Sequence, residues 1–100
     1  GPRDRAHVIE ALVPERSSSH IVGQKGERIR ALIDETGCDI HVVKEPTAGL
    51  ADQKRVRVTG NSTEEVSNAV WRLQEVLEEL VQGGVLQTRH FELREGGERA

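Results

Sequence analysis

Aromatic side chains are almost absent from this sequence of 100 residues, in which Trp71 and Phe91 are the only ones and tyrosine does not occur. Many proteins that bind single-stranded nucleic acid stack the bases on exposed aromatic rings of a sheet, and this chain lacks the side chains for that mode of binding. Its hydrophobic residues, 35% of the total, are mainly aliphatic. They predict one domain with a modest aliphatic core.

An excess of positive charge is also lacking. The formal net charge is -3 at pH 7, which argues against a protein that coats nucleic acid through a broad basic surface. The charges are nevertheless segregated along the chain, so a local basic patch remains. The basic residues of the earlier part include Lys25, Arg28, Arg30, Lys44, Lys54, Arg55 and Arg57, and the acidic residues of the later part include Glu64, Glu65, Glu75, Glu78 and Glu79.

Cysteine is nearly absent too, because Cys38 is the only one. A single cysteine rules out an internal disulfide and fits a reducing compartment. The sequence contains no run of about 18 apolar residues and no basic-then-apolar leader. We therefore expect a soluble protein of the cytoplasm or the nucleus.

Residue patterns for metal binding and for catalysis are missing. The four histidines are scattered without the spacing of metal ligands. There is no glycine-flanked nucleophilic serine, no pair of catalytic carboxylates and no phosphate-loop lysine. We expect no metal, no cofactor and no enzymatic activity.

The most informative motif in the sequence is Gly23-Gln24-Lys25-Gly26. Glycine has no Cβ, so a phosphate can approach the backbone closely and the turn can adopt positive φ. Lys25 adds a positive charge, and the helix predicted to follow would direct the positive end of its dipole to the same place. Two glycines three residues apart are weak evidence alone, because a helix-to-helix turn without a ligand has the same pattern.

Three segments have the pattern of strands. Residues 7–13 are apolar and partly β-branched, and they end at Pro14, which cannot continue a central ladder. Residues 38–44 and 55–59 alternate between two faces. Residues 47–54 have no periodicity and are predicted to be a flexible loop.

Three other segments have the pattern of helices. Residues 15–22 predict a short helix, for which the serines near its start can supply an N-cap. Residues 27–36 carry one apolar stripe and stop at Gly37, which predicts a left-handed C-terminal cap. The longest helix opens with a capping box at Ser62 and Glu65 and runs to a glycine pair.

The predicted order is strand, helix, helix, strand, strand, helix. We expect the domain to span residues 7–82, after a flexible segment at 1–6 that begins with a Gly-Pro remnant typical of tag removal. Residues 83–100 are expected to form a partly disordered tail. The apolar stripe of the last helix is interpreted as covering the sheet. The alternative is that its outer edge, with Trp71 and the tail, forms a homodimer or packs on a neighbouring domain.

This order, combined with the glycine motif, resembles a type I KH domain. Residues 21–29 match the family signature of two apolar residues, Gly-x-x-Gly and a later isoleucine. Further matches lie at residues 36–40, at 56–60 and at 65–69. The resemblance covers about residues 7–82. It implies an α+β fold, β-α-α-β-β-α, with a three-stranded antiparallel sheet packed against three helices.

The resemblance also implies a function: binding of single-stranded nucleic acid, RNA in preference to DNA, as in post-transcriptional regulation. A KH groove holds about four nucleotides, with the glycine turn on their backbone. The implied floor is aliphatic, which suits a chain without aromatic rings, and the loop at 47–54 is the implied opposite wall. Base edges would be read by Arg28, His41, Lys44 and Arg55. The complete set of implied binding residues is Ile21, Val22, Gly23, Gln24, Lys25, Gly26, Arg28, Ile29, Ile40, His41, Val42, Lys44 and Arg55.

The expected partners follow from this resemblance. They are single-stranded RNA, with single-stranded DNA as the alternative, and other domains of a larger multi-domain protein, because linkage of weak modules raises their effective concentration. A competing hypothesis is a degenerate KH domain for protein contact or dimerisation. The acidic composition and the carboxylate of Glu27, beside the expected phosphate site, keep that hypothesis open.

Overall fold

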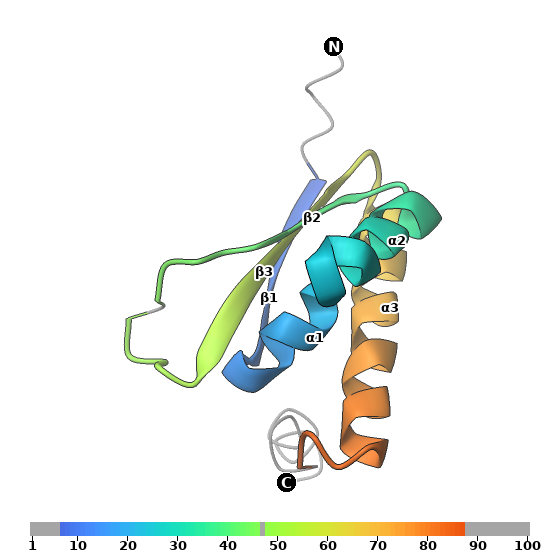
Figure 1. Cartoon of the computed structure of the whole chain (residues 1–100). Coiled ribbons are helices and arrows are strands. Elements are labelled where there is room, and N and C mark those ends of the chain that lie inside the picture. The colour runs from blue at the N-terminus through green and yellow to red at the C-terminus, as the bar shows by residue number, and fades with distance from the viewer. Residues whose placement is uncertain (1–6, 47, 88–100) are drawn as a thin grey trace, which may run out of the picture.

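The computed structural model describes residues 7–46 and 48–87. Its elements are β1 (His7–Pro14), α1 (Ser18–Val22), α2 (Glu27–Thr36), β2 (Asp39–Val42), β3 (Gln53–Gly60) and α3 (Thr63–Gln82), with short 3-10 turns at Glu15–Ser17 and Gln24–Gly26. The three helices lie on one face of the three-stranded sheet (Figure 1). The predicted α+β fold and element order are confirmed. The predictions for residues 1–6 and 88–100 lie outside the described residues.

The sheet is antiparallel, and β3 is its central strand, in the order β1-β3-β2. Val58 of β3 pairs with Ile9 of β1 and with Ile40 of β2. Because side chains alternate along a strand, Val56 and Val58 point to the helices and are completely buried. β2 occupies only the middle of the strand predicted at 38–44.

The central strand begins earlier than the sequence predicts. β3 starts at Gln53, so the expected loop at 47–54 is wrong in its last two residues. The reason lies in β1, whose last residue, Pro14, pairs with Gln53. The N–H of Glu15 then donates to the carbonyl of Asp52 at 2.8 Å. A strand continues only where the neighbouring strand supplies pairing partners for its backbone. Here that neighbouring strand is β1, which is distant from β3 in the sequence.

The core is aliphatic and joins the sheet to all three helices. Its buried side chains include Val13, Ile21, Leu32, Ile40, Val56, Val58, Val66, Ala69, Leu73, Val76 and Leu77. The apolar stripe of α3 therefore covers the sheet, as the preferred interpretation has it. Leu86, beyond the glycine pair, is 2% exposed and belongs to the same core. No helix in the described part of the chain combines the length and the apolar character needed to cross a membrane.

The helix ends confirm two predicted caps and contradict one. The Oγ of Ser62 accepts from the N–H of Glu65 at 3.1 Å, which is the predicted capping pair of α3. Gly37 ends α2 in the left-handed conformation, with φ 74°. A serine N-cap on α1 is wrong, because the Oγ atoms of Ser17 and Ser18 donate to carbonyls three residues earlier, at 2.6 and 2.9 Å. The 3-10 turn before α1 puts those carbonyls within reach of the hydroxyls.

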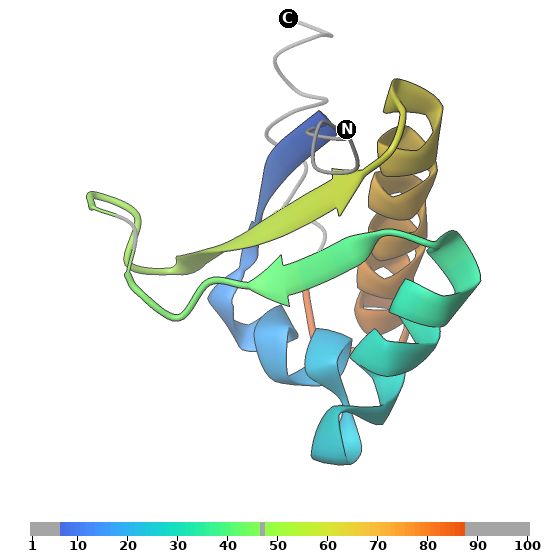
Figure 2. The ribbon, with the colours of Figure 1, turned by 90° about the horizontal axis from the view of Figure 1, so that it is seen from above.

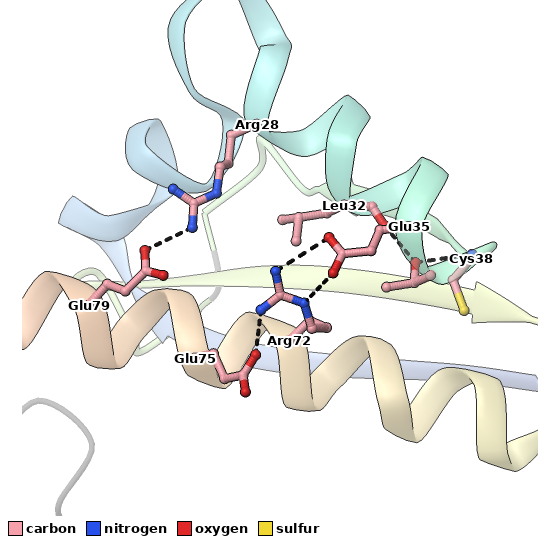
Figure 3. A network of polar contacts seen from close by, with 8 residues as sticks. Arg28, Leu32, Glu35, Cys38, Arg72, Glu75 and Glu79 are labelled. Atoms are coloured by element: carbon pink, nitrogen blue, oxygen red, sulfur yellow. Dashed lines mark hydrogen bonds and ion pairs between the residues drawn. The ribbon is translucent and has the colours of Figure 1, made fainter.

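Ion pairs hold α2 against α3 (Figure 3). Arg72 of α3 donates to Glu35 of α2 at 2.7 Å and also to Glu75 of its own helix. Arg28 of α2 donates to Glu79 of α3 at 2.8 Å. The hydrogen bond from Arg72 lowers the pKa of the Glu35 carboxyl below its ordinary value. Pairs as exposed as these are screened by water and contribute little to stability, so they orient the helices more than they stabilise the fold.

Candidate nucleic-acid interface

The turn between α1 and α2 depends on backbone conformations that favour glycine. Gly23, Lys25 and Gly26 all have positive φ, of 80°, 56° and 77°. With ψ 175°, Gly23 occupies a region that is essentially restricted to glycine. A Cβ at Gly23 would lie 2.6 Å from the Cβ of Arg28. The first glycine of the motif is therefore needed to bring the end of α1 against the start of α2.

The tip of this turn is exposed and positively charged. The side chains of Gln24 and Lys25 are both exposed. α2 begins directly afterwards at Glu27 and is ten residues long. The first amides of a helix have no acceptor within it, and they carry the positive end of the helix dipole. The N–H groups of Gly26 and Glu27 already donate within the turn, to the carbonyls of Gly23 and Gln24. The turn therefore offers an anion a lysine and the positive end of the helix dipole.

A groove of about 530 Å³ adjoins the turn. Figure 2 shows β2 on one side, with α1 and α2 along the other. The lining residues are Ser18, Ser19, Val22 and Gly23 from α1 and its end, Ile29 from α2, Ile40, His41, Val42 and Lys44 from β2 and its end, and Lys54 from β3. Its apolar part is aliphatic, and Gly23 belongs both to the groove and to the glycine turn. The two features therefore form one continuous surface.

Lysines supply the positive charge of this surface. Lys25 lies in the turn, Lys44 and Lys54 line the groove, and the chain has no other lysine. Within residues 7–46 and 48–87, no carboxylate forms an ion pair with any of the three. The ion pairs of the described residues are all made by arginines. An anion at this surface would meet ammonium groups that are not already neutralised.

Comparison with known proteins identifies the family. A family model described as "KH domain" matches residues 8–75. The chain belongs to the KH family. The solved solution structure of the fourteenth KH type I domain of human vigilin is 29% identical, with 75% of this chain and 77% of that one covered and a TM-score of 0.55. The twelfth KH type I domain of human vigilin is 28% identical, with 76% and 69% covered and a TM-score of 0.57. No curated protein matches the chain.

KH domains are modules that generally bind single-stranded nucleic acid. In this KH domain most of the residues that the resemblance implies lie together. The implied residues at the groove or in the turn are Val22, Gly23, Gln24, Lys25, Gly26, Ile29, Ile40, His41, Val42 and Lys44. They come from both sides of the groove, so the fold brings together segments that are separate in the sequence.

Three implied residues lie elsewhere in the KH domain. Ile21 is fully buried in the core, and its neighbour in α1 lines the groove instead. The guanidinium of Arg28 is directed to Glu79 of α3 (Figure 3). Arg55 lies on the outer face of the sheet, where its guanidinium donates to Glu10 at 3.4 Å. None of these three side chains lines the groove.

On the same outer face, the pKa of a second carboxyl group, that of Glu10, is lowered. Arg57 lies next to Arg55 on that face and donates to Glu10 at 2.8 Å. This hydrogen bond is the main reason why the pKa of the Glu10 carboxyl falls below its ordinary value. Glu10 therefore neutralises much of the positive charge on the outer face, whereas the lysines of the groove have no such partner among the described residues.

Three lining residues of the KH domain were not named as binding residues from the sequence, although Lys54 ends the loop that was implied as the opposite wall. Ser18 and Ser19 were interpreted only as helix-start residues. Lys54 was assigned to the flexible loop, although its spacing from Val56 and Val58 places it on the same face as those valines if the strand starts earlier. Alternation was thus the signal that could have found Lys54. Residue 47 of the same loop lies outside the described residues.

The remaining reactive side chain has a structural role in the KH domain. Cys38 is 1% exposed, and its Sγ donates to the carbonyl of Glu65 at 3.3 Å. Burial raises the pKa of the Cys38 thiol above its ordinary value, so it remains protonated at neutral pH. In the described part of the chain, no cluster of three or more His, Cys, Asp or Glu side chains could hold a metal ion.

Proposed function

We propose that this KH domain binds single-stranded nucleic acid, RNA in preference to DNA, about four nucleotides at a time. One observation carries the proposal: Gly23 belongs both to the positively charged turn and to the apolar groove. A phosphate at the turn and bases in the groove can therefore belong to the same strand.

The phosphate of this strand would be held at the glycine turn. Lys25 would approach it from the exposed tip, and the positive end of the α2 dipole would face it from the helix. Glu27, the first residue of α2, is exposed and acidic. A carboxylate at that position stabilises the helix but repels a phosphate, which limits the affinity of the turn.

The bases would lie on aliphatic side chains in place of aromatic rings. Ile29 and Ile40 approach the groove from opposite sides, and Val42 extends its apolar surface along β2. Contact with these side chains removes base faces from water without selecting one base. Hydrogen-bonding groups near the same surface, the hydroxyls of Ser18 and Ser19, would meet the base edges and supply selectivity. The side chain of His41, which pairs with Arg57, is directed to the outer face instead.

A single domain of this kind would bind weakly, because it contacts few phosphates and lacks stacking rings. The two similar vigilin domains are described as the twelfth and the fourteenth of that protein, which therefore carries many. By analogy, this domain acts beside other domains of a larger protein. Linked domains gain affinity from effective concentration without any new contact.

The test is a titration of fluorescent eight-nucleotide single-stranded pools of random sequence, one of RNA and one of DNA. Gln24→Asp combined with Lys25→Asp replaces one positive charge in the turn by two negative ones. Both side chains are exposed, and Asp tolerates the left-handed conformation that Lys25 adopts, so the fold should persist. We expect at least about ten-fold weaker binding, or about 1.4 kcal/mol. Tighter binding of the RNA pool would support the preference for RNA.

A matched control separates a local effect from total charge. Thr63→Asp, Ser67→Asp and Asn68→Asp together make the same change in net charge, on exposed positions in the first half of α3. This control should retain most of the wild-type affinity. If the turn variant binds both pools as tightly as the wild type, the proposed site is wrong.

A second candidate function is contact with another protein, including a second copy of this chain. The observation that favours it is Trp71, whose side chain on α3 is 64% exposed. Val8 and Leu12 of the edge strand β1 are also exposed, at 49% and 44%. Sedimentation velocity over a range of concentrations tests it. A dimer that Trp71→Ala dissociates, together with no binding of either pool at low salt, would favour this function over nucleic-acid binding.

A further inference from the structure

Two lysines lie side by side on the β2–β3 wall of the groove. The β2–β3 ladder pairs Val42 with Val56, and the N–H of Val43 donates to the carbonyl of Arg55 at 2.9 Å. Continuing this register by one residue places Lys44 opposite Lys54. Alternation places both on the groove face of the sheet, and both line the groove.

The position of one of these ammonium groups is fixed by the backbone. The Nζ of Lys54 donates to the carbonyl of Lys44 at 3.1 Å. That bond uses one of the three donors of the ammonium group and leaves two for a ligand. Lys54 is half-buried and Lys44 is exposed, so the pair reaches from the groove wall to its rim.

This pair is unfavourable without a ligand. Like charges directly opposite each other on neighbouring strands destabilise a sheet. Glu45 and Asp52 are the acidic residues nearest to the pair in the sequence, and neither forms an ion pair with it within the described residues. The arginines of the outer face, in contrast, share Glu10 as a partner. A ligand that brings negative charge would relieve the repulsion between both lysines at once.

We propose that Lys44 and Lys54 form a second phosphate-binding subsite for the same strand, separate from the glycine turn. This inference rests on the proposed function. A bound strand would be held by one phosphate at Lys25 and the turn and by another at the lysine pair, with bases between them on the apolar floor. The subsite would act on every sequence equally and would set a minimum length for tight binding.

The resemblance implied that Lys44 reads a base edge, whereas this proposal assigns Lys44 to the phosphate backbone of the strand. A lysine ammonium is a compact, strongly hydrated point charge with rotatable donors. A neutral base edge compensates little of the cost of removing water from the ammonium group. Because its N–H donors rotate, the ammonium group can donate to many different acceptors and selects poorly among base edges. A phosphate oxygen neutralises the charge and needs no fixed donor geometry, so two adjacent ammonium groups fit a phosphate better than a base.

The test compares the wild type with a Lys44→Gln, Lys54→Gln double variant. The ligands are eight-nucleotide single strands of oligo(A), oligo(C) and oligo(U), titrated at several salt concentrations. Each neutralised phosphate adds about 0.7 to the slope of log affinity against log salt for single strands, and the lysine pair holds one phosphate, so the variant should lose about 0.7 of that slope. Binding of all oligomers that the wild type recognises should weaken by a similar factor, on the order of ten-fold.

Two controls accompany this variant. Lys44→Arg with Lys54→Arg keeps both charges and should keep the salt slope. Arg57→Gln removes a positive charge from the outer face and should change neither slope nor affinity. Thermal unfolding of each variant verifies that it is folded.

The outcomes separate this inference from the proposed function. An unchanged slope, or a loss confined to one base, would show that the lysines do not bind phosphate and would overturn the inference alone, provided that the turn variant still weakens binding. A wild type that binds no oligomer at low salt would overturn both.

Discussion

Alanine at Gly23 should destabilise the domain much more than alanine at Gly26. At Gly23, with φ 80° and ψ 175°, the backbone is essentially restricted to glycine, which costs a substituted residue about 1–3 kcal/mol. The added Cβ would also lie 2.6 Å from the Cβ and 2.8 Å from the backbone N of Arg28. Relief requires backbone movement at the start of α2, and overpacking of this kind costs about 1–3 kcal/mol. Together these effects predict a loss of about 4 kcal/mol for Gly23→Ala.

At Gly26 the Cβ of an alanine would contact only a flexible side chain. Its φ of 77° and ψ of 13° are left-handed helical, for which a Cβ costs about 1–2 kcal/mol. The nearest atom to the added Cβ is Nη1 of Arg30, at 3.0 Å, at the end of a flexible side chain that can move. We therefore expect Gly26→Ala to lose only about 1–2 kcal/mol.

The assay is urea unfolding followed by far-UV circular dichroism, with an osmolyte added if the folded baseline of Gly23→Ala is too short. A loss for Gly26→Ala equal to or larger than that for Gly23→Ala would refute the reasoning. The result also bears on function: substitution of Gly23 destabilises the fold, so only exposed residues such as Lys25 test the phosphate site itself.

Three further predictions concern the fold. Ser62→Ala should lower the free energy of unfolding by about 1 kcal/mol, because the capped N–H of Glu65 loses its acceptor, and urea unfolding measures this. The lowered pKa of Glu35 contributes stability that is present above the ordinary carboxyl pKa and is lost as pH falls below about 5, so unfolding at pH 7 and pH 3 should differ less in Arg72→Gln than in the wild type. The buried Cys38 thiol, with its raised pKa, should react with a thiol reagent far more slowly in native protein than in urea, and equal rates would contradict its burial.

Local patterns were enough to predict the elements, because each depends on residues close in the sequence. The Ser62 cap, the Gly37 stop and the stripe of α3 all appear where expected. The start of β3 was not predicted, since it is set by pairing with the distant Pro14. The serine hydroxyls at the start of α1 were misassigned. At the N-cap of an α-helix a serine hydroxyl accepts a hydrogen bond from a backbone N–H, whereas after the 3-10 turn these hydroxyls donate to backbone carbonyls.

The candidate site was predicted as far as its backbone and apolar surface. The positions of its charged side chains were harder to predict, because each charged side chain pairs with an opposite charge that the tertiary fold brings close. Arg28 finds Glu79 on another helix, and Arg55 finds Glu10 on another strand. Neither pairing can be seen in the sequence without the tertiary contacts. Lys54 differs, because strand alternation alone would have placed it beside the groove.

The central claim is that the glycine turn and the groove together bind a single strand. The most direct measurement is the change in amide NMR chemical shifts of the isotope-labelled chain on addition of the random eight-nucleotide RNA pool at low salt. The largest changes should fall on Gly23, Gly26, Ile29 and Ile40, with little change at Arg57 on the outer face. Largest changes on the outer face or around Trp71, or none anywhere, would contradict the claim.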